Sequence, residues 1–133
     1  MKRFMKLGIA TLVLAAGVVA FSAFKKLAIL DYQWTNSTNF QIGTSPSTPI
    51  STITNYASGT TTTGGSTYLS QVEASYSGST APTEQSILDA VKTEYDRLKN
   101  ISQSTLLSTF VDGYQFTASP SGVSTQITVF LKD

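Results

Sequence analysis

The sequence predicts an α+β domain that follows an N-terminal helix long enough to cross a membrane. Three features support this prediction: an uncharged apolar run near the start, one amphipathic helical pattern, and several runs that alternate like strands. Together they indicate a small antiparallel sheet of about four to six strands with one amphipathic helix packed on it. We therefore divide the chain into a leader, residues 1–26, and an outer domain, residues 27–133.

The apolar run extends from Leu7 to Phe24 without a charged residue. As a helix it would span about 27 Å, slightly less than the roughly 30 Å of a typical hydrocarbon core. Basic side chains on both sides can close this gap, because their stems lie in the apolar zone while the charged groups reach water. The expected anchor residues are Leu7, Ile9, Leu12, Val13, Leu14, Val18, Val19, Phe21 and Phe24, flanked by Lys2, Arg3, Lys6, Lys25 and Lys26.

The excess of basic residues before the run predicts that the N-terminus stays in the cytoplasm and that residues 27–133 lie outside. The leader is either retained or removed by a signal peptidase, which needs small residues at positions −1 and −3 of its site. Residues 18–20 (VVA) and 20–22 (AFS) meet that need, whereas the length of the run and the basic pair Lys25 and Lys26 favour retention. We expect a membrane-anchored protein with an extracytoplasmic domain, and the alternative is a secreted protein.

Composition excludes several kinds of function. The chain has no cysteine and no histidine, which removes disulfides, thiolate chemistry and the commonest general base and metal ligand. Charged residues make up only 13% of the chain, and serine and threonine are abundant instead, as is typical of exported proteins. Residues 27–133 keep four basic residues against all eight acids, a net charge of −4, so they lack the basic face that binds nucleic acid.

Two segments of the outer domain have the pattern of strands. Residues 27–34 (LAILDYQW) are rich in strand-forming residues, so we expect a strand here, and the alternative is that the membrane helix continues to about Leu30. Their aromatic side chains are expected in the core rather than at a membrane surface. Residues 67–76 (TYLSQVEASY) alternate, which predicts a half-buried strand with Leu69 and Val72 on opposite faces.

Between these strands, residues 36–66 are rich in Ser, Thr and Gly, a composition typical of loops. Short edge strands are expected within this region at 39–42 and 50–56. Residues 60–65 (TTTTGG) are expected to form a mobile tip.

One helix is predicted at residues 83–100, where Thr83 can cap the N-terminus and basic residues lie near the other end. Apolar and polar residues alternate in 114–119 and in 123–131, and a Pro-Ser-Gly turn joins these two segments. This pattern predicts a β-hairpin over 114–131. Residues 106–111 fit either a helical turn or a strand, and we expect a strand. The helix should rest on the sheet through an apolar stripe formed by Ile87, Leu88, Val91, Tyr95 and Leu98.

No pattern in the sequence predicts catalysis. Half of the acids lie on the predicted helix, where a solvated face explains them, and no acid occupies a context that indicates a raised pKa. Residues 22–25 match the S-x-x-K pattern of serine acyl-enzymes but lack its companion motifs. Walker, dinucleotide-binding and EF-hand motifs are absent from the sequence. We expect no enzyme, no cofactor, no metal and no small-molecule ligand.

Asn36 and Asn100 each begin an N-glycosylation sequon. The expected function is that of a membrane-anchored structural protein whose outer domain packs against itself or other subunits, as in a pilin-like filament or a membrane-associated virion component. In one variant, residues 27–34 add as a strand to a neighbour's sheet. The alternative is an exported binding module that contacts a glycan or protein through Tyr56, Tyr68 and the loops.

Overall fold

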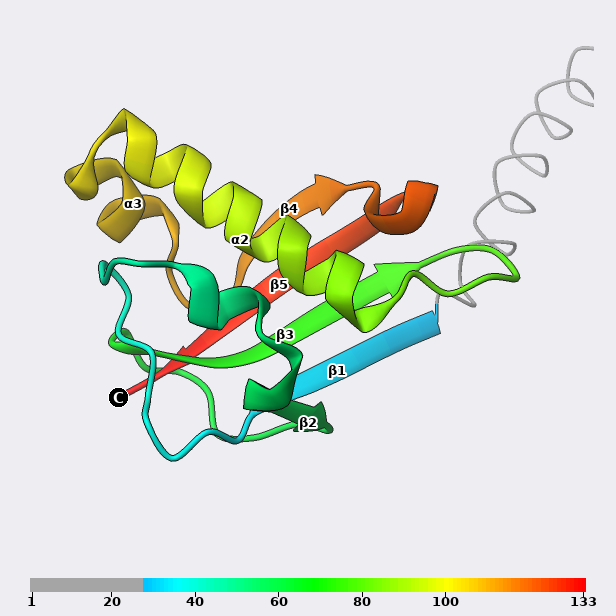
Figure 1. Ribbon diagram of the computed structural model, residues 1–133, viewed down its shortest axis with the longest axis horizontal. Coiled ribbons are helices and arrows are strands. Elements are labelled where there is room, and N and C mark those ends of the chain that lie inside the picture. The colour runs from blue at the N-terminus through cyan, green and yellow to red at the C-terminus, as the bar shows by residue number, and fades with distance from the viewer. Residues whose placement is uncertain (1–27) are drawn as a thin grey trace, which may run out of the picture.

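The computed structural model describes residues 28–133. These residues form two α-helices and a five-stranded antiparallel sheet (Figure 1). The strands lie in the order β2-β1-β3-β5-β4, which confirms the predicted α+β class. The predicted leader helix lies outside the described residues. The elements are β1 (Ala28–Trp34), β2 (Tyr56–Ser58), β3 (Tyr68–Tyr76), α2 (Glu84–Ile101), α3 (Gln103–Thr109), β4 (Tyr114–Ala118) and β5 (Thr125–Lys132), with short 3₁₀-helices at Thr48–Ser51, Ile53–Asn55 and Pro120–Gly122.

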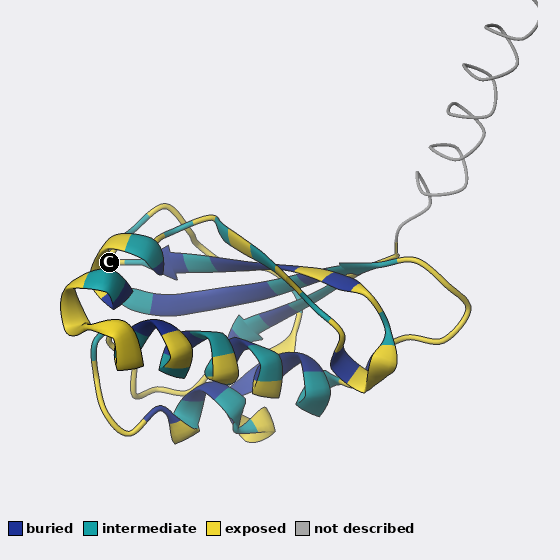
Figure 2. Ribbon diagram, turned by 90° about the horizontal axis from the view of Figure 1, so that it is seen from above, coloured by how far each residue is buried: buried dark blue, intermediate teal, exposed yellow. Residues whose placement is uncertain are grey.

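Helix α2 lies along one face of the sheet, as predicted (Figure 2). The Thr83 side chain accepts a hydrogen bond from the Ser86 N–H and so caps the helix. All five residues of the predicted apolar stripe are buried, with at most 2% of their surface exposed. Within residues 28–133, neither α-helix has both the length and the apolar character that crossing a membrane requires.

The interior strand β3 shows why the register of the sheet could not be predicted from alternation alone. A bulge between Leu69 and Gln71 inserts an extra residue, so Leu69 pairs with Leu131 while Val72 pairs with Val129. The prediction that Leu69 and Val72 lie on opposite faces is therefore wrong, because the bulge shifts the alternation by one residue. Both side chains are fully buried beneath α2.

Three other predicted segments differ in the structure. Residues 103–109 form helix α3 rather than a strand at 106–111, because Leu106 and Phe110, four residues apart, both turn into the core. In the predicted edge strand 50–56, a 3₁₀-helix precedes β2, which begins only at Tyr56. In place of the edge strand predicted at 39–42, the structure has a single antiparallel bridge between Gln41 and Tyr68.

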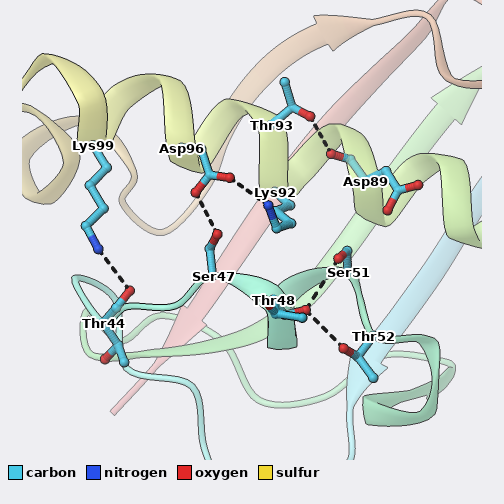
Figure 3. Close-up of polar contacts among 10 residues, drawn as sticks. All are labelled: Thr44, Ser47, Thr48, Ser51, Thr52, Asp89, Lys92, Thr93, Asp96 and Lys99. Atoms are coloured by element: carbon cyan, nitrogen blue, oxygen red, sulfur yellow. Dashed lines mark hydrogen bonds and ion pairs between the residues drawn. The ribbon is translucent and has the colours of Figure 1, made fainter.

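The segment from Gly43 to Thr52 is held against α2 by polar contacts rather than by strand pairing (Figure 3). The buried Tyr95 hydroxyl accepts from the Gly43 N–H at 2.8 Å and donates to the Thr44 carbonyl at 2.9 Å. Asp96 accepts a hydrogen bond from Ser47 at 2.6 Å. The two bonds of Tyr95 satisfy loop backbone groups that would otherwise lack partners next to the core.

The predicted tip at 60–65 is bonded to the sheet at both ends. The Thr61 N–H donates to the Gln71 side chain at 3.1 Å, and the Gly65 N–H donates to the Leu131 carbonyl at 3.0 Å. Only glycine fits at position 65, because a Cβ there would lie 2.2 Å from the backbone of Lys132.

Candidate functional site

Strand β4 forms an open edge of the sheet. It pairs with β5 on one side, and within residues 28–133 no strand pairs with its other side. Its sequence, YQFTA, contains no charged residue and no proline. Natural edge strands usually carry lysine, proline or a bulge that prevents pairing with other chains. The sequence of β4 thus leaves this edge able to accept another strand.

The face of β4 that points toward α2 is incompletely covered. Phe116 and Tyr114 are half-buried, whereas their register partners on β5, Ile127 and Val129, are fully buried. The uncovered space is a groove of about 440 Å³ between β4 and α2, with Phe116 in its wall. The groove therefore exposes apolar and aromatic surface beside an unpaired strand.

Polar contacts join α2 to β4 near one end of this groove and to the 3₁₀-helix after β4 near the other. At one end, the Tyr114 hydroxyl donates to the Glu94 carboxylate. Arg97 donates twice to the same carboxylate, from Nε at 2.7 Å and from Nη2 at 2.9 Å. At the other end, Ser121 donates to Ser86 at 2.8 Å. The two elements are thus held at a defined separation, and the groove keeps its shape without an occupant.

The hydrogen bonds from Arg97 lower the pKa of the Glu94 carboxyl below its usual range, outweighing the opposite effect of burial. The Tyr114 hydroxyl also lowers the pKa of Glu94. Glu94 therefore stays ionised to a lower pH than an ordinary glutamate does.

A second stretch of open edge lies at the start of β1. Strand β2 pairs only with residues from Tyr32 to Trp34 of β1, and the Gly59 N–H closes this ladder on the Asp31 carbonyl at 3.0 Å. Within the described residues, the outer side of Ala28–Leu30 has no strand partner. This open stretch is shorter than β4.

On the sheet face opposite α2, the register places Asp31 directly across from Glu73. Burial raises the pKa of Glu73 above its usual range, and the charge of Asp31 and a hydrogen bond with it raise it further. Burial also raises the pKa of Glu84. The expectation that no acid has a raised pKa is therefore wrong, because pairing of strands distant in sequence brings Asp31 and Glu73 together.

The two carboxyls lie outside the groove beside β4, and no third acid joins them. Within residues 28–133, no group of three acidic side chains is close enough to hold a metal ion. The Gln71 amide donates a hydrogen bond to one carboxylate oxygen of Asp31, Oδ1, at 3.1 Å. Because the pKa of Glu73 is raised here, this contact makes the sheet sensitive to pH.

A smaller pocket of about 290 Å³ lies beyond the end of β1 and has mainly apolar walls with several amide side chains among them. Amide side chains of Asn36, Asn39, Gln41 and Asn55 line it, and Trp34 forms part of its apolar wall. Asn36 donates to Asn55 at 2.6 Å, so two of these amides are already paired with each other.

The structure separates the residues named for the alternative binding function. Tyr56 is buried and donates to the Ile50 carbonyl at 2.7 Å, so its ring is unavailable to a glycan. Tyr68 is half-buried at the start of β3. The two sequon residues, Asn36 and Asn100, are both exposed, and their use as glycosylation sites stays a prediction.

Sequence reasoning placed β4 in a hairpin but missed its role as an uncharged sheet edge. The absence of charge in residues 114–118 was a visible signal. Their position at the edge was not, because strand order is set by contacts between distant segments. Comparison with protein-family models, curated proteins and solved structures finds no match for the chain.

Proposed function

We propose that the protein is a non-enzymatic, membrane-anchored structural component whose outer domain assembles with other subunits. In this proposal the helix of residues 1–26 stays in a lipid bilayer, and the domain lies on the extracytoplasmic side. Its assembly would build a filament or a membrane-associated particle shell. The observation that carries the proposal is the uncharged open edge of β4 beside a groove that exposes part of Phe116.

The position of β1 supports an anchored role. This strand begins at Ala28, two residues after Lys26, and lies in the interior of the sheet between β2 and β3. Six consecutive register pairs join it to β3, from Ala28 to Gln33. A force on the leader would therefore act directly on β1. The hydrogen bonds between β1 and β3 would resist that force together. The same placement argues against donation of residues 27–34 to a neighbour.

Membrane anchoring is tested by a pair of identical substitutions in the full chain, expressed from its own start. Leu14→Arg places a charge at the centre of the apolar run, which costs about 2.5–3.5 kcal/mol of insertion free energy. Leu107→Arg makes the same change at a domain position that is 51% exposed. We expect the native chain and the Leu107→Arg variant to remain in the membrane pellet after an alkaline wash, and Leu14→Arg to be depleted from it.

N-terminal sequencing of protein from its native source then distinguishes a retained leader from a cleaved one. Negative-stain imaging of the same material shows whether polymers or particles form. Recovery of the intact chain as a cytosolic monomer without detergent would contradict the proposal, as would a native chain that lacks residues 1–26 and does not assemble.

The pocket that combines Trp34 with amide side chains favours a second candidate, an exported module that binds a glycan. Amide side chains are suited to paired hydrogen bonds with sugar hydroxyls. Trp34, the single tryptophan of the chain, lines this pocket and provides a fluorescence signal for titration with monosaccharides. An Asn39→Ala variant should lose any such response, while Asn100→Ala, far from the pocket, should keep it. No change in the fluorescence of the native chain would contradict this candidate.

A further inference from the structure

We propose that β4 pairs with β4 of a second copy of this chain, antiparallel and about a two-fold axis that passes beside Phe116. This pairing would join two five-stranded sheets into one continuous sheet. The inference rests on the proposed function, for which it names the partner and the surface. Two-fold contacts, in which the same patch serves on both subunits, are the commonest in homo-oligomers.

The register centred on Phe116 uses the whole of β4. Each Phe116 lies opposite its own counterpart, each Gln115 lies opposite Thr117 of the other copy, and each Tyr114 lies opposite Ala118. Side chains directly opposite each other in an antiparallel pair share a face. The aromatic residues therefore meet over the groove, and the polar residues meet on the open face. A register shifted by one residue would place apolar side chains opposite polar ones, so this register is less stable.

Charge supports a second copy as the occupant. Self-pairing of β4 opposes no like charges, because the strand has none. Tyr114 contacts Glu94 near one end of the groove, and Ser121 contacts Ser86 near the other, so α2 runs antiparallel to β4. The two-fold operation then places the end that carries Arg97 across from the end that carries Asp89 of the second copy. Arg97 bonds Glu94 but keeps a side chain that is 55% exposed, and Asp89 is also exposed, so the pairing brings opposite and not like charges toward each other.

The other open edge is a weaker partner for β4. The terminal strand there, β2, has only three residues, and Ala28–Leu30 of β1 form a separate open stretch that ends at the Gly59 contact. Self-pairing of β4 offers five residues on each side. Because more backbone hydrogen bonds and more side-chain contacts form, the pairing of β4 with itself is favoured.

This pairing has a geometric consequence for an anchored protein. The two-fold axis of an antiparallel strand pair is perpendicular to the sheet, so the two Ala28 residues lie at opposite ends of the joined sheet. If both leaders enter one bilayer, the axis coincides with the bilayer normal. The joined sheet then lies flat along the membrane surface instead of standing upright.

Cross-linking tests the inference directly, because the chain has no cysteine. In Phe116→Cys, the two introduced thiols meet beside the axis, where opposed Cβ atoms are about 4.5–5.5 Å apart, within the range for a disulfide. Mild oxidation of the full-length variant in membranes should give a band at twice the 14.2 kDa mass of the chain. Gln126→Cys, exposed on the same sheet but one strand further in, is the matched control and should give little dimer.

A second pair of variants leaves Phe116 intact, in case its truncation prevents folding. Thr117→Lys introduces a charge on the open face of the edge strand, and Gln126→Lys introduces the same charge on the neighbouring strand. We expect Thr117→Lys to weaken self-association of the detergent-solubilised chain roughly tenfold, and Gln126→Lys to leave it unchanged. Self-association is measured by sedimentation.

Three outcomes would overturn the inference. They are equal cross-linking of Phe116→Cys and Gln126→Cys, cross-linking of Phe116→Cys to a different protein, and insensitivity of self-association to Thr117→Lys. If polymers are still seen by imaging in any of these cases, the assembly role stands and the contact lies elsewhere. If the intact chain is a cytosolic monomer, the proposed function itself fails.

Discussion

At the scale of single residues, the pairing of Asp31 with Glu73 makes the stability of the domain depend on pH. Burial and the Asp31 carboxylate raise the pKa of Glu73 in the folded state. The folded state therefore favours protonated Glu73, and this contribution is complete below the unfolded pKa of Glu73. It is lost as the pH rises through the higher folded pKa.

Glu73→Gln should remove this dependence, because a neutral amide fits beside Asp31 at any pH. We expect the variant to gain about 0.2–1 kcal/mol in the free energy of unfolding at pH 7, the usual size of a like-charge cross-strand effect. Denaturant titrations between pH 4 and pH 8 measure the gain. Asp89→Asn, an exposed carboxylate outside the pair, serves as control, and an equal gain there would contradict the explanation.

Glu94 has the opposite dependence on pH. Hydrogen bonds from Arg97 and Tyr114 lower its folded-state pKa, so their contribution is present above the unfolded pKa and is lost as the pH falls through the folded one. Glu94→Gln should cost about 0.5–1.5 kcal/mol at neutral pH, because a partly buried charged acceptor is removed. Thermal unfolding at pH 7 and pH 3 should show the loss at pH 7 and a smaller loss at pH 3. A loss that is equal at both values would show that the charge of Glu94 is unimportant.

At the scale of elements, α2 holds the segment from Gly43 to Thr52 in place. Tyr95 is fully buried, and its hydroxyl bonds both Gly43 and Thr44. Tyr95→Phe keeps the ring but leaves the Gly43 N–H without its partner. We expect a loss of about 1–3 kcal/mol in stability. Hydrogen exchange should show faster exchange at Gly43 but unchanged exchange in β3, and unchanged exchange at both places would contradict the proposed attachment.

The elements that the sequence predicted well are those with local signals. Helix α2 has its cap at Thr83 and a complete apolar stripe within eighteen residues. The hairpin of β4 and β5 has its turn at Pro120–Gly122. Helix α3 was missed although Ser102 caps it and Leu106 and Phe110 have helical spacing, because its short length left the strand pattern equally plausible. The bulge in β3 has no local signal of this kind.

At the scale of the whole molecule, residues 28–133 contain a complete core. Its buried apolar residues extend from Tyr32 to Leu131 and come from every part of the described chain. A chain shortened to residues 27–133 should therefore unfold cooperatively, with a midpoint within a few degrees of the full-length protein in the same detergent. Circular dichroism measures both midpoints. Loss of a cooperative transition in the shortened chain would show that the leader contributes to the fold.

The sequence by itself determined the α+β class, the limits of α2, the terminal hairpin and the exclusion of chemistry that needs cysteine or histidine. These follow from residue types and from periodicity over short distances. Only the tertiary structure decided that β4 is an uncharged edge, that α2 leaves it partly uncovered, and that Asp31 lies across from Glu73. Strand order and register create all three features, and they depend on the packing of segments that lie far apart along the chain.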